Sequence, residues 1–290
     1  MTRLFGFAQF EFAGTLAVAD GRFVVRDGGG ERVLVVETLA APPPARRRRR
    51  RPRDAQADQL PAELPLARIT VVRAFEELED DDAAQAWLKT ASGEEETVDR
   101  MVEEGIADLN SALHAHAVAS GDPNLQAVTP RRAVTVRIGY GSGEELADGV
   151  FTAAREVDLG QGGTASRRRQ RDEELSPQQR LAAVLGGREQ LNACETLLLR
   201  ARGDLNAGRN REAALQLRVG LEALLIELRG ALADPGHEED MATLQARRHQ
   251  AGELANAALS GALDTEQAEA LGELLGLAER VLRRRRILAG

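Results

Sequence analysis

The sequence predicts an α+β fold, in which an amino-terminal, mostly antiparallel sheet with one or two helices is followed by an all-α carboxy-terminal helical bundle. Three observations support this prediction. Apolar residues alternate at period two through much of the first half, leucines recur at helical spacing in the last third, and a glycine- and arginine-rich segment separates the two patterns. We therefore expect an α+β domain over residues 1–158, a linker over 159–175 and a bundle of about five helices over 176–290.

The composition limits what the chain can be. Its 290 residues suffice for two hydrophobic cores, and because aromatic residues make up only 3%, leucine, valine and alanine must supply most of the buried surface. The single cysteine, Cys194, excludes an internal disulfide and a metal site made of thiolates alone. Its apolar spacing within a helical pattern indicates a buried structural thiol.

The amino-terminal strands should form a β-meander. We expect strands over Arg3–Phe12, Arg22–Arg26 and Arg32–Thr38, the last two joined by a hairpin in which Gly28 to Gly30 supply the positive φ angles of a tight turn. The continuous apolar run Val33–Val36 indicates burial on both faces, so we expect this strand to be central.

A basic insertion should follow at about residues 40–65. Prolines deny backbone donors to a sheet and densely packed like charges resist burial, so we predict an extended excursion between strands. We expect this segment to be a solvated loop. The alternative is a weak site for a nucleic acid or another polyanion, because each neutralised phosphate releases counterions. The candidate anion-binding residues are Arg46, Arg47, Arg48, Arg49, Arg50, Arg51 and Arg53.

Regular spacing of apolar residues resumes after the insertion. We expect a strand over Ala67–Phe75, a short helix after the acidic run Glu76–Asp82, a long helix over Val98–Ala117 and further strands at Val134–Ile138 and about Val150–Val157. This order favours helices layered on a largely antiparallel sheet.

The segment Gly139–Gly143 lies where phosphate-cradling loops begin. It lacks the Lys-Ser/Thr ending of such loops and no helix is expected behind it. We therefore predict a glycine-rich hairpin connection.

The last third should contain only helices. Ser176 followed by proline is a helix start, and four further helices follow from apolar spacing over Leu191–Leu205, Ala214–Leu228, Met241–Leu259 and Leu271–Leu288. Because no apolar face of this kind can stay exposed to water, the helices should pack together.

One pair of these helices has a family likeness. Small and apolar residues fall where a tetratricopeptide repeat places them, and the segment resembles one such repeat over about 34 residues. It lacks the aromatic residues of that family and has no second copy at the same period. The residues concerned are Ala201, Gly208, Ala213, Leu217 and Gly220.

No constellation of residues specifies a reaction. His114 and His116 lie two apart on a predicted helix, so their side chains point in different directions and cannot share a metal without distortion, which leaves a site assembled from distant segments as the alternative. We expect no cofactor and no metal site. An enzyme whose site assembles only in the folded chain stays an alternative, with Tyr140, Ser142 and Asp148 beside the two histidines as its candidates.

The most defensible function is therefore non-enzymatic. We expect an interaction or adaptor protein that binds another protein through its helical domain, and the alternative is an anion- or RNA-binding accessory protein that uses arginine clusters, including Arg167–Arg169 and Arg283–Arg286. Gln9 and Glu11 interrupt the apolar stretch that would imitate a secretory signal, so we expect mature, cytoplasmic protein. No apolar run approaches the length of about 18 residues that a membrane span requires.

Overall fold

A computed structural model describes residues 3–27, 30–39, 65–158, 178, 180–230 and 234–289. The chain divides into two compact units, residues 1–161 and residues 162–290. The first contains an antiparallel sheet with helices and the second is helical, which confirms the predicted fold class. The arginine run at 46–53 and the predicted linker over 159–175 lie outside the described residues.

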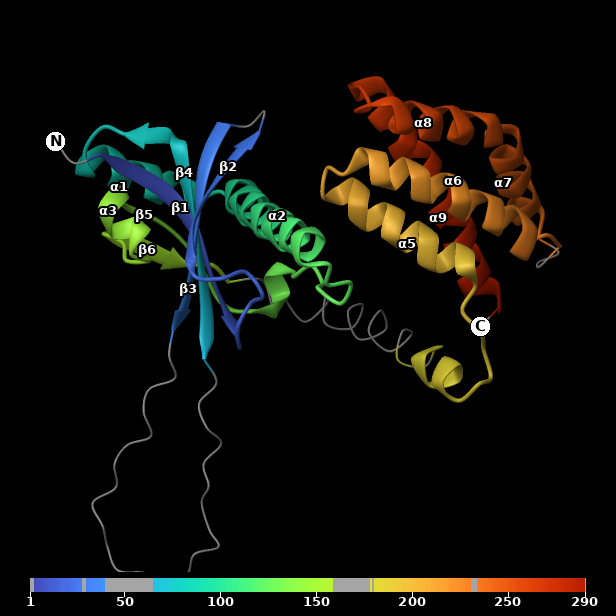
Figure 1. The fold of residues 1–290 in the computed structure, drawn as a ribbon, viewed down its shortest axis with the longest axis horizontal. Coiled ribbons are helices and arrows are strands. Elements are labelled where there is room, and N and C mark those ends of the chain that lie inside the picture. Colours follow the sequence, from blue (N-terminus) through green and yellow to red (C-terminus); the bar gives the residue numbers. More distant parts are fainter. Residues whose placement is uncertain are drawn as a thin grey trace, which may run out of the picture. The chain divides into compact units, whose positions relative to one another are not determined.

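The first unit is built on a six-stranded sheet with the order β2-β3-β4-β1-β5-β6 (Figure 1). Every pair of neighbouring strands is antiparallel. The strands are β1 (Leu4–Ala13), β2 (Gly21–Asp27), β3 (Gly30–Leu39), β4 (Leu66–Leu78), β5 (Ala133–Ser142) and β6 (Ala153–Glu156).

The predicted β-meander is wrong in its first step. β1 does not pair with β2 but lies between β4 and β5, so that β1 and β4 occupy the middle of the sheet and β3 lies second from its edge. Burial explains why β1 lies in the middle of the sheet. Phe7 and Phe10 of this strand point to opposite faces, and neither side chain is exposed at all. A strand that is apolar on both faces is most stable where both faces can be covered.

One face of the sheet is covered by two helices, α1 (Asp81–Ala91) and α2 (Glu95–Ser120). Acidic residues occupy the first turn of both helices, where the helix dipole favours negative charge. The Asp80 carboxylate also caps α1 by accepting a hydrogen bond from the Ala83 amide at 2.8 Å. Between sheet and helices lies the main core of this unit, which includes Phe10, Phe12, Ile69, Leu109 and Ile138.

The opposite face carries a smaller apolar cluster beneath the short helix α3 (Gly143–Ala147). The prediction of a hairpin connection over Gly139–Gly143 is wrong, because Gly139 to Ser142 belong to β5 and a helix follows at once. Close packing explains the glycines. A Cβ atom on Gly139 would lie 2.2 Å from the carbonyl oxygen of Ala153 on the neighbouring strand.

The second unit contains α5 (Ala193–Asn206), α6 (Asn210–Glu227), α7 (Pro235–Ala246), α8 (Arg248–Ser260) and α9 (Thr265–Ala289). Figure 1 shows α9 passing behind α5 and α6, and a shared core of leucine and alanine joins these helices. Residues 180–185 are also helical, whereas the predicted cap Ser176 lies outside the described residues.

One predicted helix is divided. The pattern over Met241–Leu259 suggested a single helix, but the chain bends at Arg247 and continues as α8. The bend lets α7 pack mainly on α9 while α8 packs mainly on α6, so that Leu244 and Leu254 reach the same core from different sides. A straight helix could not cover both neighbours.

Candidate interaction surface of the helical unit

Most of the arginines predicted to bind anions cannot be placed. Arg46–Arg51, Arg53 and Arg167–Arg169 lie outside the described residues, so their role stays a prediction. The remaining cluster, Arg283–Arg286, lies near the end of α9.

The side chains of that cluster diverge. Arg284 contacts Asp234 at 3.2 Å, at the start of α7, while Arg286 lies 4.0 Å from Glu195 at the start of α5. Successive residues on a helix point about 100° apart, so four consecutive arginines cannot share one surface. Arg284 and Arg286 therefore form ion pairs that connect α9 to α7 and to α5.

The hydroxyl groups considered for catalysis have structural roles. Tyr140 is 1% exposed and its hydroxyl donates to Asp81 at 3.0 Å; burial, together with this carboxylate, raises the pKa of the phenol. The Ser142 hydroxyl accepts from the Glu145 amide at 3.2 Å, while the Glu145 carboxylate accepts from the Ser142 amide at 2.9 Å. This reciprocal capping box fixes the start of α3.

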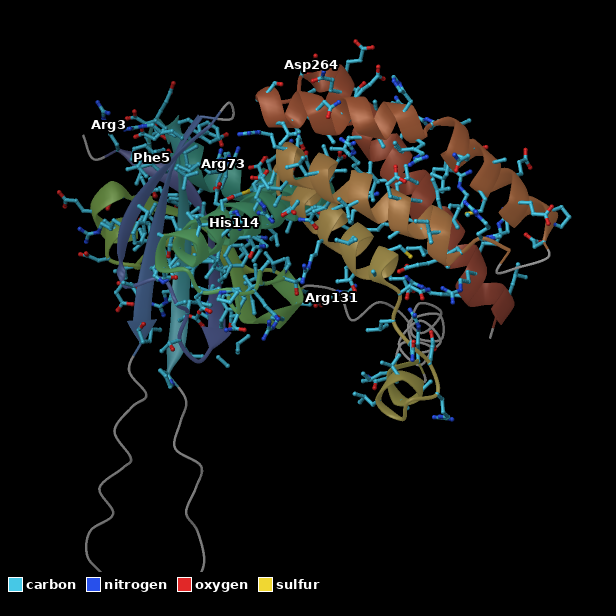
Figure 2. All side chains as sticks on the ribbon, turned by 45° about the vertical axis from the view of Figure 1, so that its right-hand side comes forward. Arg3, Phe5, Arg73, His114, Arg131 and Asp264 are labelled. Carbon is cyan, nitrogen blue, oxygen red and sulfur yellow. The ribbon has the colours of Figure 1, made fainter. Side chains whose placement is uncertain are left out.

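The other candidate side chains lie apart from these. Asp148 forms an exposed ion pair with Arg22 at 2.7 Å. His114 lies on α2 with an exposed side chain (Figure 2), and His116 of the same helix is half-buried. The fold therefore does not assemble the predicted catalytic candidates into one site.

A polar groove of about 610 Å³ does lie beside Asp148, between the β2–β3 end of the sheet and α3. Its lining includes Asp20, Arg22 and Glu37. Burial raises the pKa of Glu37, and the negative charges of Asp148 and Asp20 add to this effect while Arg68 opposes it. The lining offers carboxylates and one guanidinium but no histidine, cysteine or serine that could act as a nucleophile.

The helical unit carries a different kind of surface, along the side of α6 that faces away from the core. Val219 and Ile226 lie on this side, and we call them the α6 outer face. Val219 is 56% exposed and Ile226 71% exposed, whereas Leu217, Leu221 and Leu224 on the opposite side are fully buried. The two outer residues are seven positions apart, close to two helical turns, so they lie on one side of the helix.

The apolar positions that the sequence pattern predicted for this helix all lie on the buried side of α6. The sequence does hold a signal for the outer face, because Val219 and Ile226 are seven residues apart, a helical repeat. α6 is thus apolar on two sides, and one core can cover only one of them.

Polar contacts hold α6 in a fixed position against α8. Arg211 donates to the Ala258 carbonyl oxygen at 2.7 Å, and Arg248 pairs with Glu222 at 2.6 Å near the other end. These contacts align the two helices antiparallel. They also bring the exposed Leu259 of α8, which is 65% exposed, to the same end of the pair as Arg211.

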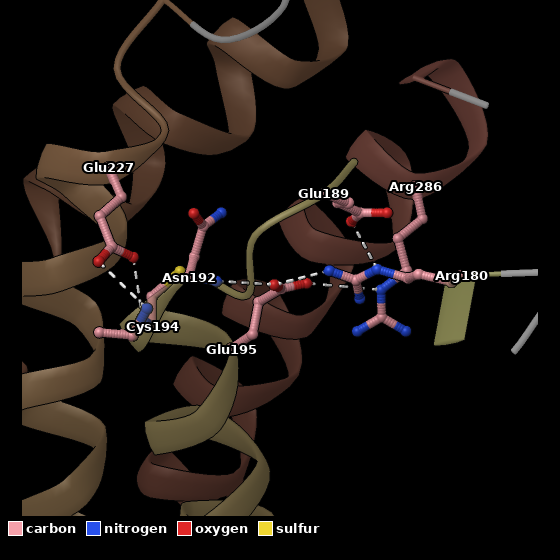
Figure 3. Close-up of polar contacts among 8 residues, drawn as sticks. Arg180, Glu189, Asn192, Cys194, Glu195, Glu227 and Arg286 are labelled. Atoms are coloured by element: carbon pink, nitrogen blue, oxygen red, sulfur yellow. Dashed lines mark hydrogen bonds and ion pairs between the residues drawn. The ribbon is translucent and has the colours of Figure 1, made fainter. Parts of the chain in front are cut away.

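A polar network, drawn in Figure 3, anchors the start of α5. Arg180 donates to Glu189 at 2.7 Å and to Glu195 at 2.8 Å, and Glu195 also accepts from the Asn192 amide at 3.2 Å. Burial raises the pKa of Glu195, but the hydrogen bonds from Arg180 and Asn192 outweigh it and hold the pKa below the ordinary value.

The same helix start is capped from α6. The Glu227 carboxylate accepts from the amides of Ala193 at 3.2 Å and Cys194 at 3.0 Å (Figure 3). The Cys194 thiol is fully buried, and burial together with the nearby Glu227 raises its pKa to about 12. This confirms the prediction of a buried thiol, and it removes Cys194 as a nucleophile at neutral pH.

No grouping of three or more His, Cys, Asp or Glu suited to a metal ion occurs in the described ranges. Among the helices of those ranges, none has the length and apolar character needed to cross a bilayer. No protein-family model matches the chain, and no curated protein or solved structure matches it either.

Proposed function

We propose that this chain is a non-catalytic interaction protein, and that its helical unit binds another protein through the α6 outer face. The observation that carries the proposal is the pair Val219 and Ile226, two large apolar side chains that are mostly exposed on one stripe of a rigidly held helix. Covering such side chains contributes about 25 cal/mol per Å² of apolar surface removed from water.

Two further observations support it. α6 is held by α5 on one side and α8 on another, so the outer face needs no rearrangement before it binds, which lowers the entropic cost of association. The candidates for a catalytic site are dispersed or engaged in capping. A partner that lays apolar side chains of its own along α6 fits this surface.

A cytoplasmic setting is part of the proposal. It is supported by the cysteine content, because the single cysteine, Cys194, is a free thiol buried in the helical unit.

The test is affinity purification of the full chain from native lysate, with and without nuclease, in three forms. They are the wild type, the double variant Val219→Gln/Ile226→Gln, and the control Val118→Gln. Val118 is an exposed valine on α2, 71% exposed, so the control removes an exposed apolar side chain from a different helix.

The proposal expects a protein partner that survives nuclease, is retained by the wild type and the control, and is lost with the double variant. Purified partner and chain should then bind directly, with the affinity of the double variant reduced about tenfold or more. Retention of every partner by the double variant contradicts the proposal. A change in self-association alone, measured by light scattering, would assign the face to a homo-oligomer instead.

A further inference from the structure

A second surface of the helical unit lies in an open groove of about 630 Å³ between α7 and α9. Three of its lining residues are arginines and one is acidic. The residues on which the inference rests are Arg247, Glu273, Gly276, Leu277, Arg280 and Arg283.

The three guanidinium groups are only partly neutralised. Arg247 lies 3.4 Å from Glu273, and Arg280 lies 3.8 Å from Asp240, close to the limit of an ion pair, with 60% of its side chain exposed. Arg283 forms no ion pair with any described residue. The lining therefore carries an excess of positive charge, although the whole chain has a formal net charge of -8.

The geometry of α9 places two of these charges together. Arg280 and Arg283 are three residues apart on one helix, so their side chains leave the same side of it, and Arg247 approaches from the junction of α7 and α8. Guanidinium groups from two elements that line one groove match an anion with several oxygens, because each planar group can donate two parallel hydrogen bonds.

The floor of the groove leaves room for a ligand. Gly276 has no side chain, and a Cβ atom placed on it would meet no other heavy atom within 4 Å. Leu277 beside it is 6% exposed and gives an apolar base. No aromatic residue lines the groove, so it offers no platform on which nucleic-acid bases could stack.

We propose that this groove binds a phosphate monoester, whose phosphoryl oxygens are held by Arg280 and Arg283 with Arg247 on the opposite wall. The dianionic phosphoryl group matches the excess positive charge better than a single carboxylate does, and the space over Gly276 accommodates the alcohol part of the ester. The groove is separate from the α6 outer face, so this inference does not depend on the proposed function.

The test uses the full chain and four probes: inorganic phosphate, O-phosphoserine, a short phosphoserine peptide with its unphosphorylated counterpart, and a single-stranded oligonucleotide. Binding is followed by calorimetry and by the ¹H–¹⁵N signals of the arginine Nε–Hε groups. We expect saturable shifts with inorganic phosphate, O-phosphoserine and the phosphoserine peptide, and none with the unphosphorylated peptide.

Matched variants locate the site. Arg280→Gln and Arg283→Gln should each weaken binding about tenfold, whereas Arg200→Gln should not, since Arg200 is an exposed arginine of α5 without an ion pair to any described residue. Gly276→Leu should block the groove without changing its charge. Gly252→Leu on α8, another helical glycine with open space around it, is its control.

The outcomes separate the possible sources of phosphate. Saturation by O-phosphoserine supports a small ester, and saturation by the phosphopeptide alone supports a modified protein segment. The inference is overturned if no phosphate-bearing small probe or peptide saturates, if Arg200→Gln weakens binding as much as Arg283→Gln does, or if only the oligonucleotide binds. Val219→Gln should leave phosphate binding unchanged, which keeps this result distinct from that of the proposed function.

Discussion

Arg32 of β3 and Asp108 of α2 form a two-pronged ion pair inside the interface between sheet and helix. The Arg32 Nε atom donates to one carboxylate oxygen at 2.6 Å and a terminal nitrogen donates to the other at 3.0 Å. Only 10% of the arginine side chain and 6% of the aspartate side chain are exposed. The pair connects residues 76 positions apart in the sequence.

Removing one partner of this pair should lower the free energy of unfolding strongly, whereas replacing both partners with apolar residues should lower it little. Asp108→Leu leaves a buried guanidinium without its carboxylate and should lower the free energy of unfolding by about 3–5 kcal/mol. The double variant Arg32→Met/Asp108→Leu removes both of these charges together and should recover most of that loss. Urea unfolding measures both, and equal stability of the single and double variants would contradict this account.

Gly105 of α2 should resist substitution although it lies within a helix. A Cβ atom there would lie 2.8 Å from the Phe10 ring, so Gly105→Ala forces the helix away from the sheet. Overpacking of about 1–3 kcal/mol should exceed the gain of about 1 kcal/mol in helix propensity, and the variant should be destabilised. Gly203→Ala on α5, where nothing lies within 4 Å, is the control and should be stabilising. Thermal melts of the two variants should move in opposite directions.

The helical unit should lose stability in acid through Glu195. Because the pKa of this carboxyl is lower in the folded state than its ordinary value of 4.5, its contribution to stability is present above that value and disappears as the pH falls through the folded pKa. Glu195→Gln should remove this part of the pH dependence while reducing stability at pH 7. Urea midpoints measured between about pH 7 and pH 3 test it, and an unchanged acid slope in the variant would contradict the assignment.

Cys194 should not react while the helical unit is folded. The thiol is fully buried and its pKa is raised to about 12, so almost no thiolate exists at pH 8. A thiol reagent should therefore label the protein only at the rate at which this unit opens, and the rate should rise in urea. Rapid, complete labelling in native buffer would show that the α5 end of the core is open to solvent.

A fragment of residues 176–290 should fold without the first unit. Its core is formed by residues between Cys194 and Leu282, and none of them comes from residues 1–161. Circular dichroism should show a helical spectrum and a cooperative melt. An unstructured fragment would mean that the leucine faces need the other unit to stay folded.

The elements with strong periodicity could be predicted. The alternation at Val136 and Ile138 gave β5, and the acidic residues at Asp80–Asp82 gave the start of α1, because both signals depend on neighbouring residues only. The glycines at 139–143 misled for a related reason. Glycine marks a turn and a close approach equally well, and only the position of the Ala153 carbonyl oxygen distinguishes the two.

The candidate surfaces were harder to find. The sequence drew attention to Arg46–Arg51 because a run of like charge is conspicuous, whereas Arg247, Arg280 and Arg283 share a groove only after α7 and α9 have packed. Val219 and Ile226 were similarly hidden, since their spacing fits a buried stripe as well as an exposed one.

The sequence by itself determined the division into a sheet-containing part and a helical part, since periods of two and of three to four residues are local properties of the chain. Only the tertiary structure decided that β1 lies between β4 and β5, that the chain bends at Arg247, and which side of α6 stays exposed. Those choices depend on which surfaces can be covered together, and burial is a property of distant segments that no local pattern contains.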